Sequence, residues 1–372
     1  MSRLPANPPV IAGFTYLRPL GSGGFADVFL YEQNLPRRQV AVKVLPTDVS
    51  DPEVRRMFHA EADALARLSA HPSIVTIHQA SVSADGRPYI VMELCASSMG
   101  QRYRTEQISL AEVLNAGVKV ACALETAHRA GVLHRDVKPS NILITEYGAP
   151  VLSDFGIAAS LRVANPRDVF AMSVPWSAPE VLSVSTVGSV ASEVWGLGAT
   201  VYSLLAGRSP FEVPDGQNGL DQIKQRIVRV AQRPTGRWDV PARLEEVLSR
   251  SMSLVPRDRH QSAAEFARDL QQVQRLNGMP ETPLELTASG WSSAPADFDA
   301  DSDFGVTRVK VAQPSERKRA TGKGLSSRSA GSDSTSMSHT PPVRRSSWPW
   351  VIAGVVVTVM VAVVVWLLVG VL

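Results

Sequence analysis

Apolar residues alternate with polar ones near the start of the chain, which predicts strands. The alternation covers Phe14–Leu20 and Asp27–Gln33 on either side of Gly21-Ser22-Gly23-Gly24, the pattern of a β-hairpin with a glycine-rich turn. Gln39–Leu45 and Arg87–Cys95 are apolar runs of strand length. The first part of the chain is therefore expected to form a β-sheet.

Helical spacing replaces alternation after about Ser97, and one earlier helix is expected from about Pro52 to Leu68. Ser109–Ala130 has apolar residues at helical spacing, with Ser109 as its N-cap and Gly131 as its stop signal. A strongly apolar helix over Val190–Leu205 is followed by amphipathic stretches near 218–231, 241–253 and 262–276. The pattern predicts an α+β fold in which the sheet precedes a mainly helical part.

The end of the chain predicts a transmembrane helix. Val351–Leu372 contains no charged residue, and at about 1.5 Å per residue it reaches roughly 33 Å, enough for a hydrocarbon core of about 30 Å. Trp348 and Trp350 suit an interfacial anchor, so the span is placed at 348–372. A buried core helix is the weaker alternative, because few soluble helices lack polar residues on every face.

Charge predicts the orientation of that helix. The polar, proline-containing N-terminal lead (residues 1–13) has no secretory signal. Basic residues precede the predicted span, which favours a cytoplasmic location for the bulk of the chain; they are Arg317, Lys318, Arg319, Lys323, Arg328, Arg344 and Arg345. We expect a single-pass protein of the cell membrane with no extracellular domain.

Residues 277–347 are rich in Ser, Gly, Pro and charge, which predicts a disordered juxtamembrane linker. Its charge is divided. The stretch 281–303 holds six acidic and no basic residues, whereas 308–345 holds nine basic and two acidic residues, a net of +7. The basic half could lie on an anionic membrane surface, and a solvated tether is the alternative.

Composition narrows the function classes. A chain of 372 residues with 44% hydrophobic residues can bury a sizeable core. The formal charge of +3 is too small to indicate nucleic-acid binding. The two cysteines, Cys95 and Cys122, have no metal-ligand spacing and imply no disulfide framework.

The candidate chemistry lies in His134–Asn141 and in Asp154-Phe155-Gly156. Asp136, Lys138 and Asn141, with Asp154 further on, supply a proton acceptor, a cation and two oxygen ligands for a metal ion. This is a set of groups suited to phosphoryl transfer.

Two further features point the same way. The glycine-rich turn could bring backbone N–H groups close to a phosphate, although a plain hairpin turn would also explain it. A dinucleotide-binding fold is disfavoured, because a strand rather than a helix follows the turn. Lys43 lies in an apolar strand and needs an acidic partner, for which Glu61 is the candidate.

Residues of about 14 to 276 resemble a eukaryotic-type (Hanks-type) protein kinase domain, most closely the bacterial membrane-anchored serine/threonine kinases. The resemblance rests on the glycine-rich turn, Val40-Ala41-Val42-Lys43, the His134–Asn141 stretch, Asp154-Phe155-Gly156, Ala178-Pro179-Glu180 and Arg259, which occur in this order. It implies a bilobal fold with an N-lobe (about 14–95) of antiparallel sheet plus one helix and a mainly helical C-lobe (about 96–276).

The resemblance implies a site for ATP and a metal ion, Mg²⁺ with Mn²⁺ as an alternative. Asp136 would accept the proton of the attacking hydroxyl and Lys138 would sit beside the γ-phosphate, while Asn141 and Asp154 would hold the metal. A lysine at position 138 is similar to the serine/threonine class. The residues implied at the nucleotide are Gly21, Gly23, Val28, Ala41, Lys43, Glu61, Glu93 and Cys95.

Some positions depart from the family pattern. Ala26 replaces the third glycine, and Glu193 stands where an Asp usually braces the catalytic loop, so one extra methylene could shift that brace. Between Gly156 and Glu180 the only hydroxyl residues are Ser160, Ser173 and Ser177. Ser173 is assigned a structural contact with Asp136 and Lys138. Arg135 is hypothesised to meet Asp168 or to be free, and Glu180 is expected to pair with Arg259.

Three functions follow, in order of preference. The first is a membrane-anchored kinase that transfers the ATP γ-phosphate to Ser or Thr hydroxyls of protein substrates and of itself. The alternative is a catalytically weak or inactive pseudokinase that acts as a membrane-tethered scaffold, and a small-molecule phosphotransferase comes last. The resemblance also implies a homodimer, and no nucleic-acid partner is expected.

Overall fold

The computed structural model describes residues 7–22, 26–45, 52–155, 173–183, 186, 188–229 and 231–286, apart from a few side chains near the start of the first helix, that of Glu61 among them. The predicted membrane segment and most of the predicted linker lie outside these residues. Within the part of the chain that is described, no helix is both long enough and apolar enough to cross a membrane.

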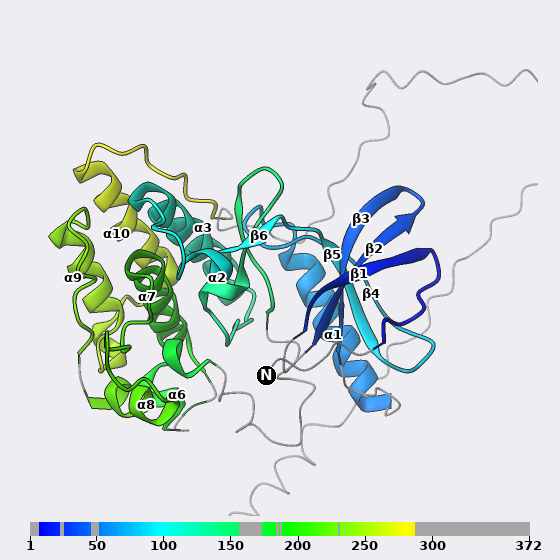
Figure 1. Ribbon diagram of the computed structural model, residues 1–372, viewed down its shortest axis with the longest axis horizontal. Helices are drawn as coiled ribbons and strands as arrows, with labels where there is room; N and C mark the ends of the chain where they lie inside the picture. Colours follow the sequence, from blue (N-terminus) through cyan, green and yellow to red (C-terminus); the bar gives the residue numbers. More distant parts are fainter. Residues whose placement is uncertain are drawn as a thin grey trace, which may run out of the picture. The chain divides into compact units, whose positions relative to one another are not determined.

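The four predicted strands form one antiparallel sheet together with a fifth strand, Ile77–Val82, that the sequence pattern did not reveal (Figure 1). Phe14 pairs with Gln33 and Gly21 with Val28, so β1 and β2 form the expected hairpin arms. In spatial order the strands are β1 (Phe14–Ser22), β2 (Asp27–Asn34), β3 (Arg37–Val44), β5 (Pro88–Glu93) and β4 (Ile77–Val82).

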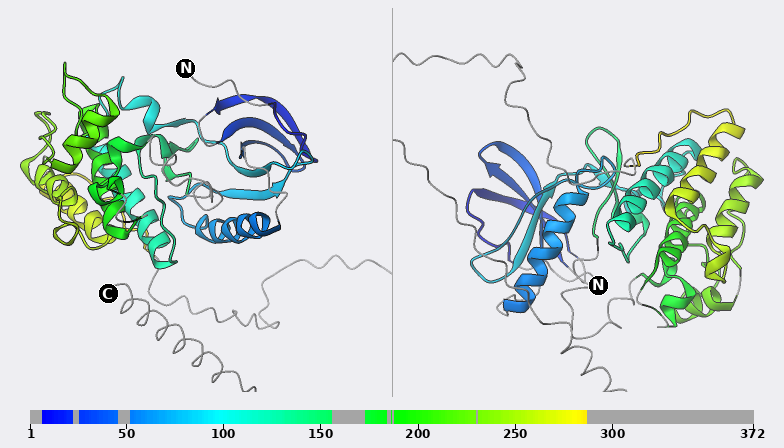
Figure 2. Two further views of the ribbon diagram at one scale, coloured as in Figure 1. Left: turned by 90° about the horizontal axis from the view of Figure 1, so that it is seen from below. Right: turned by 180° about the vertical axis from the view of Figure 1, so that it is seen from behind.

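One helix, α1 (Pro52–Leu68), accompanies this sheet, and Figure 2 shows it running alongside the strands. The predicted packed face is confirmed, because Phe58, Leu65 and Leu68 are all buried in a cluster that also contains Ile90 of β5. Burying a side chain of this size stabilises the fold by about 1.5–3 kcal/mol.

The N-terminal lead is more structured than its composition indicates. Ile11 is buried in the apolar cluster of the sheet, and the Tyr31 hydroxyl donates a hydrogen bond to the carbonyl oxygen of Pro9 at 2.6 Å. The polar, proline-containing stretch hides a single apolar anchor, which periodicity does not reveal. Residues 7–13 therefore pack on the N-lobe, directly before the predicted domain start at residue 14.

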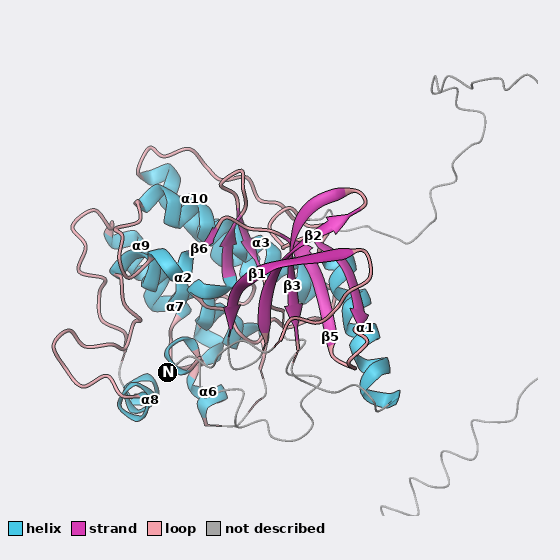
Figure 3. Cartoon of the chain, turned by 45° about the vertical axis from the view of Figure 1, so that its right-hand side comes forward, coloured by secondary structure: helices cyan, strands magenta, loops and turns pink. Residues whose placement is uncertain are grey.

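The second part of the described chain is mainly helical (Figure 3). α7 (Val190–Ala206) is buried on nearly every side, as expected for a helix that is apolar all round. Trp195 of α7 is fully buried and stacks on Phe211, with ring centroids 5.8 Å apart. The helices packed around α7 are α3 (Leu110–Arg129), α9 (Ala242–Ser251) and α10 (Ala263–Leu276), with α6 (Pro179–Leu182) and α8 (Leu220–Arg229) beyond them.

A small sheet joins the two parts of the chain. Its order is β6-β7-β8, where β6 is Ser97–Ser98, β7 is Ile142–Ile144 and β8 is Pro150–Leu152. The short helix α2 (Met99–Arg102) follows β6 and begins with a capping box between Ser98 and Gln101. β7 follows Asn141 directly and β8 ends just before Asp154, so this sheet places both predicted metal ligands.

Residues 277–286 correct the predicted start of the linker. Thr282 is buried, and Leu284 and Leu286 pack against the main core cluster. The stretch carries no periodic pattern because its contacts are made by single side chains and by its backbone. The described residues form the expected bilobal α+β fold, with a packed segment after α10.

Candidate active site

His134 fixes the start of the loop that carries the candidate chemistry. α3 ends at Arg129, and His134 beyond it is completely buried. The His134 Nε2 donates to the carbonyl oxygen of Ser153 at 2.7 Å, and its Nδ1 accepts from the backbone N–H of Asp136 at 3.2 Å. The ring also packs on Phe155, with centroids 4.6 Å apart. One imidazole therefore ties the loop to the segment that contains Asp154.

A buried carboxylate braces the same loop. Arg135 has a φ of 67°, a left-handed conformation that costs a non-glycine residue about 1–3 kcal/mol. Its backbone N–H donates to Glu193 Oε1 at 2.5 Å, and the other carboxylate oxygen lies 2.6 Å from His128 Nε2. Glu193 and His128 are both almost fully buried. Glu193 thus makes the contact with the loop that its extra methylene was expected to shift. His128 is a second partner of this carboxylate, which the sequence did not reveal.

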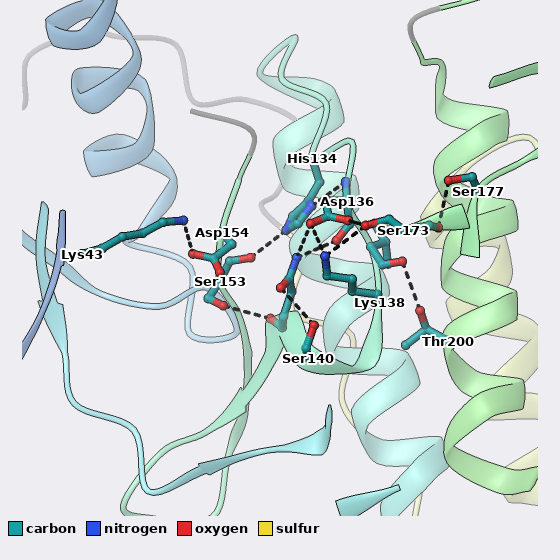
Figure 4. A network of polar contacts seen from close by, with 12 residues as sticks. Lys43, His134, Asp136, Lys138, Ser140, Ser153, Asp154, Ser173, Ser177 and Thr200 are labelled. Carbon is teal, nitrogen blue, oxygen red and sulfur yellow. Dashed lines mark hydrogen bonds and ion pairs between the residues drawn. The ribbon is translucent and has the colours of Figure 1, made fainter. Parts of the chain in front are cut away.

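The side chain of Asp136 lies at the centre of a polar network (Figure 4). Its Oδ1 accepts from the Ser173 hydroxyl at 2.5 Å, and its Oδ2 lies 2.7 Å from Lys138 Nζ and 3.1 Å from Asn141 Nδ2. Lys138 also donates to the Ser173 hydroxyl at 3.0 Å, so the contacts assigned to Ser173 are confirmed. A carboxylate offers about four lone-pair positions, which leaves Asp136 able to accept one more proton donor.

Lys43 of β3 reaches across to Asp154. Its Nζ lies 2.6 Å from Asp154 Oδ1. Burial tends to raise the pKa of the Asp154 carboxyl, but the attraction and hydrogen bond of Lys43 outweigh this and hold the pKa below its usual value. Asp154 therefore stays ionised beside Lys43. The predicted pairing of Lys43 with Glu61 remains a prediction, because the Glu61 side chain lies outside the described residues.

The donors near Asp154 fit a hard divalent cation. Asn141 uses its amide nitrogen on Asp136, and its Oδ1, which accepts a long hydrogen bond of 3.4 Å from the Ser140 hydroxyl, keeps a second lone pair for a metal ion. Asp154 offers carboxylate oxygens. Such oxygens suit Mg²⁺, which usually takes one or two protein ligands together with phosphate oxygens and water. No group of three or more His, Cys, Asp or Glu residues suited to a metal occurs among the described residues.

An apolar cluster lies where the adenine is expected. The structure brings together four buried side chains from both lobes, with four partly buried side chains packed around them. The predicted residues Val28, Ala41 and Cys95 are among them. The sequence reasoning missed the others, which share only an apolar side chain. They are Met92 in β5, Leu143 in β7 and Val151 in β8, with Val75 and Leu94 outside the strands.

Of the other residues predicted to bind the nucleotide, the structure describes some and leaves others outside the described residues. Gly21 lies one residue before the end of β1, opposite Val28, and an added Cβ there would meet nothing within 4 Å. Gly23 lies outside the described residues. Glu93 ends β5, and its backbone N–H donates to the carbonyl oxygen of Thr76 at 2.9 Å. The hypothesised partner of Arg135, Asp168, also lies outside the described residues.

Gly100 of α2 packs closely against the catalytic loop at Ser140. A Cβ on Gly100 of α2 would lie 2.6 Å from the Ser140 Cα, a distance that real Cβ atoms do not show. The close approach therefore requires glycine at this position. Sequence reasoning missed this contact because α2 and the loop are far apart along the chain.

The expected ion pair between Glu180 and Arg259 is confirmed. The guanidinium is completely buried and holds both carboxylate oxygens, at 2.6 and 2.9 Å. It also donates to the carbonyl oxygens of Ala191 and Ser253 and lies 4.9 Å from the Trp195 ring centroid. This arrangement anchors the segment around Glu180 to the helical core.

A pocket opens beside Asp136 on the side of Ser173. Apolar atoms of Val137, Trp176 and Val181 line it together with Asp136 and Ser173 themselves.

Comparison with known proteins agrees with the geometry. The family model described as "Protein kinase domain" matches residues 14–274. The chain is 41% identical over 286 residues to the serine/threonine-protein kinase PknK of Mycobacterium tuberculosis, a match that covers 74% of this chain and 25% of PknK. It is 34% identical to the probable serine/threonine-protein kinase PknB of Corynebacterium glutamicum, over 69% of this chain and 41% of that protein.

A solved structure is similar as well. The crystal structure of the Mycobacterium tuberculosis PknI kinase domain, in a mutant form, matches with a TM-score of 0.52 and 30% sequence identity. The match covers 73% of this chain and 99% of that structure. The chain thus corresponds to about a quarter of PknK, and in each comparison the shared part is about the length of the bilobal domain.

Proposed function

The chain belongs to the protein kinase family, and from that premise we propose that it transfers the γ-phosphoryl group of ATP to serine or threonine hydroxyls of protein substrates. The observation that carries the proposal is the placement of Asp136 among Lys138, Ser173 and Asn141, close to the Lys43–Asp154 ion pair. These groups supply a proton acceptor and positive charge at one place.

Asp136 accepts the proton in the proposed reaction. The acceptor hydroxyl oxygen bonds to the γ-phosphorus, and the bond from that phosphorus to the β,γ-bridging oxygen breaks, leaving its electron pair on ADP. The hydroxyl proton passes to Asp136. Ser173 and Lys138 fix the orientation of the carboxylate, since each binds one of its oxygens. Because the transition state is loose, most of the acceleration comes from positioning and charge.

Lys138 and Lys43 supply positive charge at two places along the triphosphate. Lys138 lies beside the proton acceptor and faces the γ-phosphate, while Lys43 binds the α- and β-phosphates. A Mg²⁺ ion held by Asn141 and Asp154 would neutralise the charge that develops between the β- and γ-phosphates. The preference for serine and threonine is supported by Lys138 and by the relatives named as serine/threonine kinases.

Transfer of radiolabel from ATP tests this function. The full-length chain is incubated with labelled ATP, Mg²⁺ and a general protein acceptor. Lys43→Met should abolish transfer, because the variant removes the phosphate-facing cation and the partner of Asp154. Lys224→Met is the matched control, since Lys224 is exposed on α8 and should leave transfer unchanged. Transfer that survives Lys43→Met would refute the assignment.

We also propose that the chain is anchored in a membrane by 348–372. The support is the absence of charge over Val351–Leu372 and the basic residues before it. Replacing both Val361 and Val365 by Asp should release the chain from the membrane fraction, because each central acidic residue costs about 2.5–3.5 kcal/mol on insertion. The wild-type chain should sediment with membranes and resist a carbonate wash, and its recovery in the soluble fraction would contradict anchoring.

Self-phosphorylation and self-association complete the proposal. If the chain phosphorylates itself, its intact mass should rise by whole phosphate increments after incubation with Mg²⁺ and ATP. If it associates with itself, sedimentation should detect a dimer. The pseudokinase alternative rests on Glu193 and on the few hydroxyl residues between Gly156 and Glu180. The first reason is removed, because Glu193 makes the brace, and the second falls mostly outside the described residues.

A further inference from the structure

The segment after α10, residues 277–286, packs against the C-lobe, and we name it the tail strap. Its middle is fixed at Thr282, which is buried. The Thr282 N–H donates to Gln274 Oε1 at 2.9 Å, its carbonyl oxygen accepts from Gln271 Nε2 at 2.7 Å, and its hydroxyl lies 3.2 Å from Asn115 Oδ1. The last residues of a domain are usually poorly ordered unless specific contacts hold them. The strap is therefore held by specific partners on α10 and α3.

Glu285 in the strap joins two distant parts of the fold. One carboxylate oxygen lies 2.7 Å from Lys119 Nζ on α3, and the other accepts from the Ser73 hydroxyl at 2.7 Å. The backbone carbonyl oxygen of Glu285 accepts from His71 Nε2 at 2.7 Å. His71 and Ser73 belong to the turn between α1 and β4. A single residue thus connects that turn to α3.

The same turn holds β8, the strand that leads to Asp154. The Ser73 carbonyl oxygen accepts from the Leu152 N–H at 2.9 Å, and the Val75 N–H donates to the Leu152 carbonyl oxygen at 3.0 Å. The next residue, Ser153, donates its N–H to the carbonyl oxygen of Asn141 at 2.9 Å. Hydrogen bonds therefore connect Glu285 to Ser73, Ser73 to Leu152, and Ser153 to the backbone of Asn141. Asp154 follows Ser153 directly in the sequence.

The contacts of Glu285 differ from those of an ordinary surface acid. Its side chain is 24% exposed and Lys119 is 20% exposed, whereas Glu281 and Arg275, which pair at 2.9 Å in the same region, are 40% and 54% exposed. Exposed pairs of the second kind contribute about 0–1 kcal/mol. Removing one partner from a half-buried carboxylate whose two oxygens both have partners costs more stability than removing a partner from an exposed pair.

We propose that Glu285 is a positioning residue for phosphoryl transfer: through Ser73 and Leu152 it sets the place of β8, and hence of Asp154. The inference rests on the proposed kinase function and extends the catalytic unit beyond α10 to residue 286. Groups that orient metal ligands typically change metal affinity or activity by about 10–100-fold when they are removed.

The test uses the full-length chain with two variants at position 285. Glu285→Ala removes both contacts of the carboxylate, whereas Glu285→Gln keeps an acceptor for Ser73 and loses the charge that faces Lys119. Glu281→Gln is the matched control, because it alters a strap carboxylate that pairs with Arg275 on α10. For each variant we would measure kcat, the KM values for ATP and acceptor, the half-saturating Mg²⁺ concentration, and amide hydrogen exchange over 150–155 without nucleotide.

Glu285→Ala should raise the half-saturating Mg²⁺ concentration and lower kcat by about tenfold each, while the acceptor KM stays unchanged. The Leu152 amide should exchange about tenfold faster, because its acceptor on Ser73 is less firmly held. Glu285→Gln should fall between wild type and Glu285→Ala, and it carries the test if the alanine variant folds poorly. Glu281→Gln should match wild type in every measurement.

The outcomes separate this inference from the proposed function. Wild-type chain that transfers no phosphate would refute kinase activity, and the exchange of Leu152 would still test the link from Glu285 to β8. An active wild type whose Mg²⁺ requirement and Leu152 exchange are unaffected by Glu285→Ala would refute the positioning role. Equal changes in Glu281→Gln would also refute it, since they would show a general effect of strap charge.

Discussion

Replacing Arg259 by alanine should strongly destabilise the C-lobe. The guanidinium is completely buried and makes four hydrogen bonds: two to the Glu180 carboxylate and one each to the carbonyl oxygens of Ala191 and Ser253. Its loss leaves a largely buried carboxylate without this partner. Removing one member of a buried ion pair costs about 3–5 kcal/mol, so we take about 4 kcal/mol as the expected loss.

Thermal denaturation measures this loss. For domains of about 150–250 residues, 1 kcal/mol shifts Tm by about 2–4 °C, so a loss of about 4 kcal/mol predicts a fall of roughly 8–16 °C. Arg257→Ala is the matched control from the same turn, because the Arg257 side chain is 89% exposed and lies 4.0 Å from Asp258. That variant should shift Tm by less than about 2 °C.

A double variant isolates the pair itself. Glu180→Gln combined with Arg259→Ala should be less destabilising than the sum of the two single changes, because the double variant buries no unpaired charge. Equal Tm values for Arg259→Ala and Arg257→Ala would refute the view that this ion pair anchors the segment around Glu180. Strict additivity in the double variant would refute the electrostatic part of the reasoning.

Three further predictions concern the site and its supports. Ser173→Ala should lower kcat by about 10–100-fold, since a hydrogen bond to a charged group contributes about 1.5–3 kcal/mol, and Ser173→Thr should restore most of it in steady-state kinetics. Glu193→Ala should lower kcat by about 100-fold with little change in the KM for ATP, because the loop at Arg135 loses its brace; a proportionate rise in KM would count against this. Burial lowers the pKa of His71 below 6.5, so the folded chain favours the neutral ring, and its contribution to stability is present above about pH 6.5 and lost as the pH falls further. Between pH 7 and pH 5 the Tm of His71→Gln should therefore fall by less than that of wild type.

The sequence predicts the elements and the catalytic side chains because both leave local signals. The apolar faces of α1 and α7 repeat along each helix, and Asp136, Lys138 and Asn141 lie within one short motif. The contacts of Ser173 with Asp136 and Lys138 are expected from the family resemblance, and the structure confirms them.

The supports of the site leave no such signal. Ser73 and Glu285 are 212 positions apart, and His128 and Glu193 are 65 apart, so only the folded chain brings them together. The tail strap is held by hydrogen bonds at Thr282 and Glu285 rather than by a periodic apolar face. Its composition therefore looks like that of a linker. Ile11 is a single anchor without periodicity. Contacts of this kind depend on tertiary packing, which spacing along the sequence does not encode.

The central claim is that Asp136 directs phosphate to serine or threonine hydroxyls of proteins. Phosphoamino-acid analysis of a protein acceptor labelled by the full-length chain tests it most directly, with Asp136→Asn measured beside wild type. The account predicts phosphoserine and phosphothreonine without phosphotyrosine, and at least about a 100-fold loss of label with Asp136→Asn, because the proton acceptor is lost. Label found on tyrosine, or label unchanged in Asp136→Asn, would contradict it.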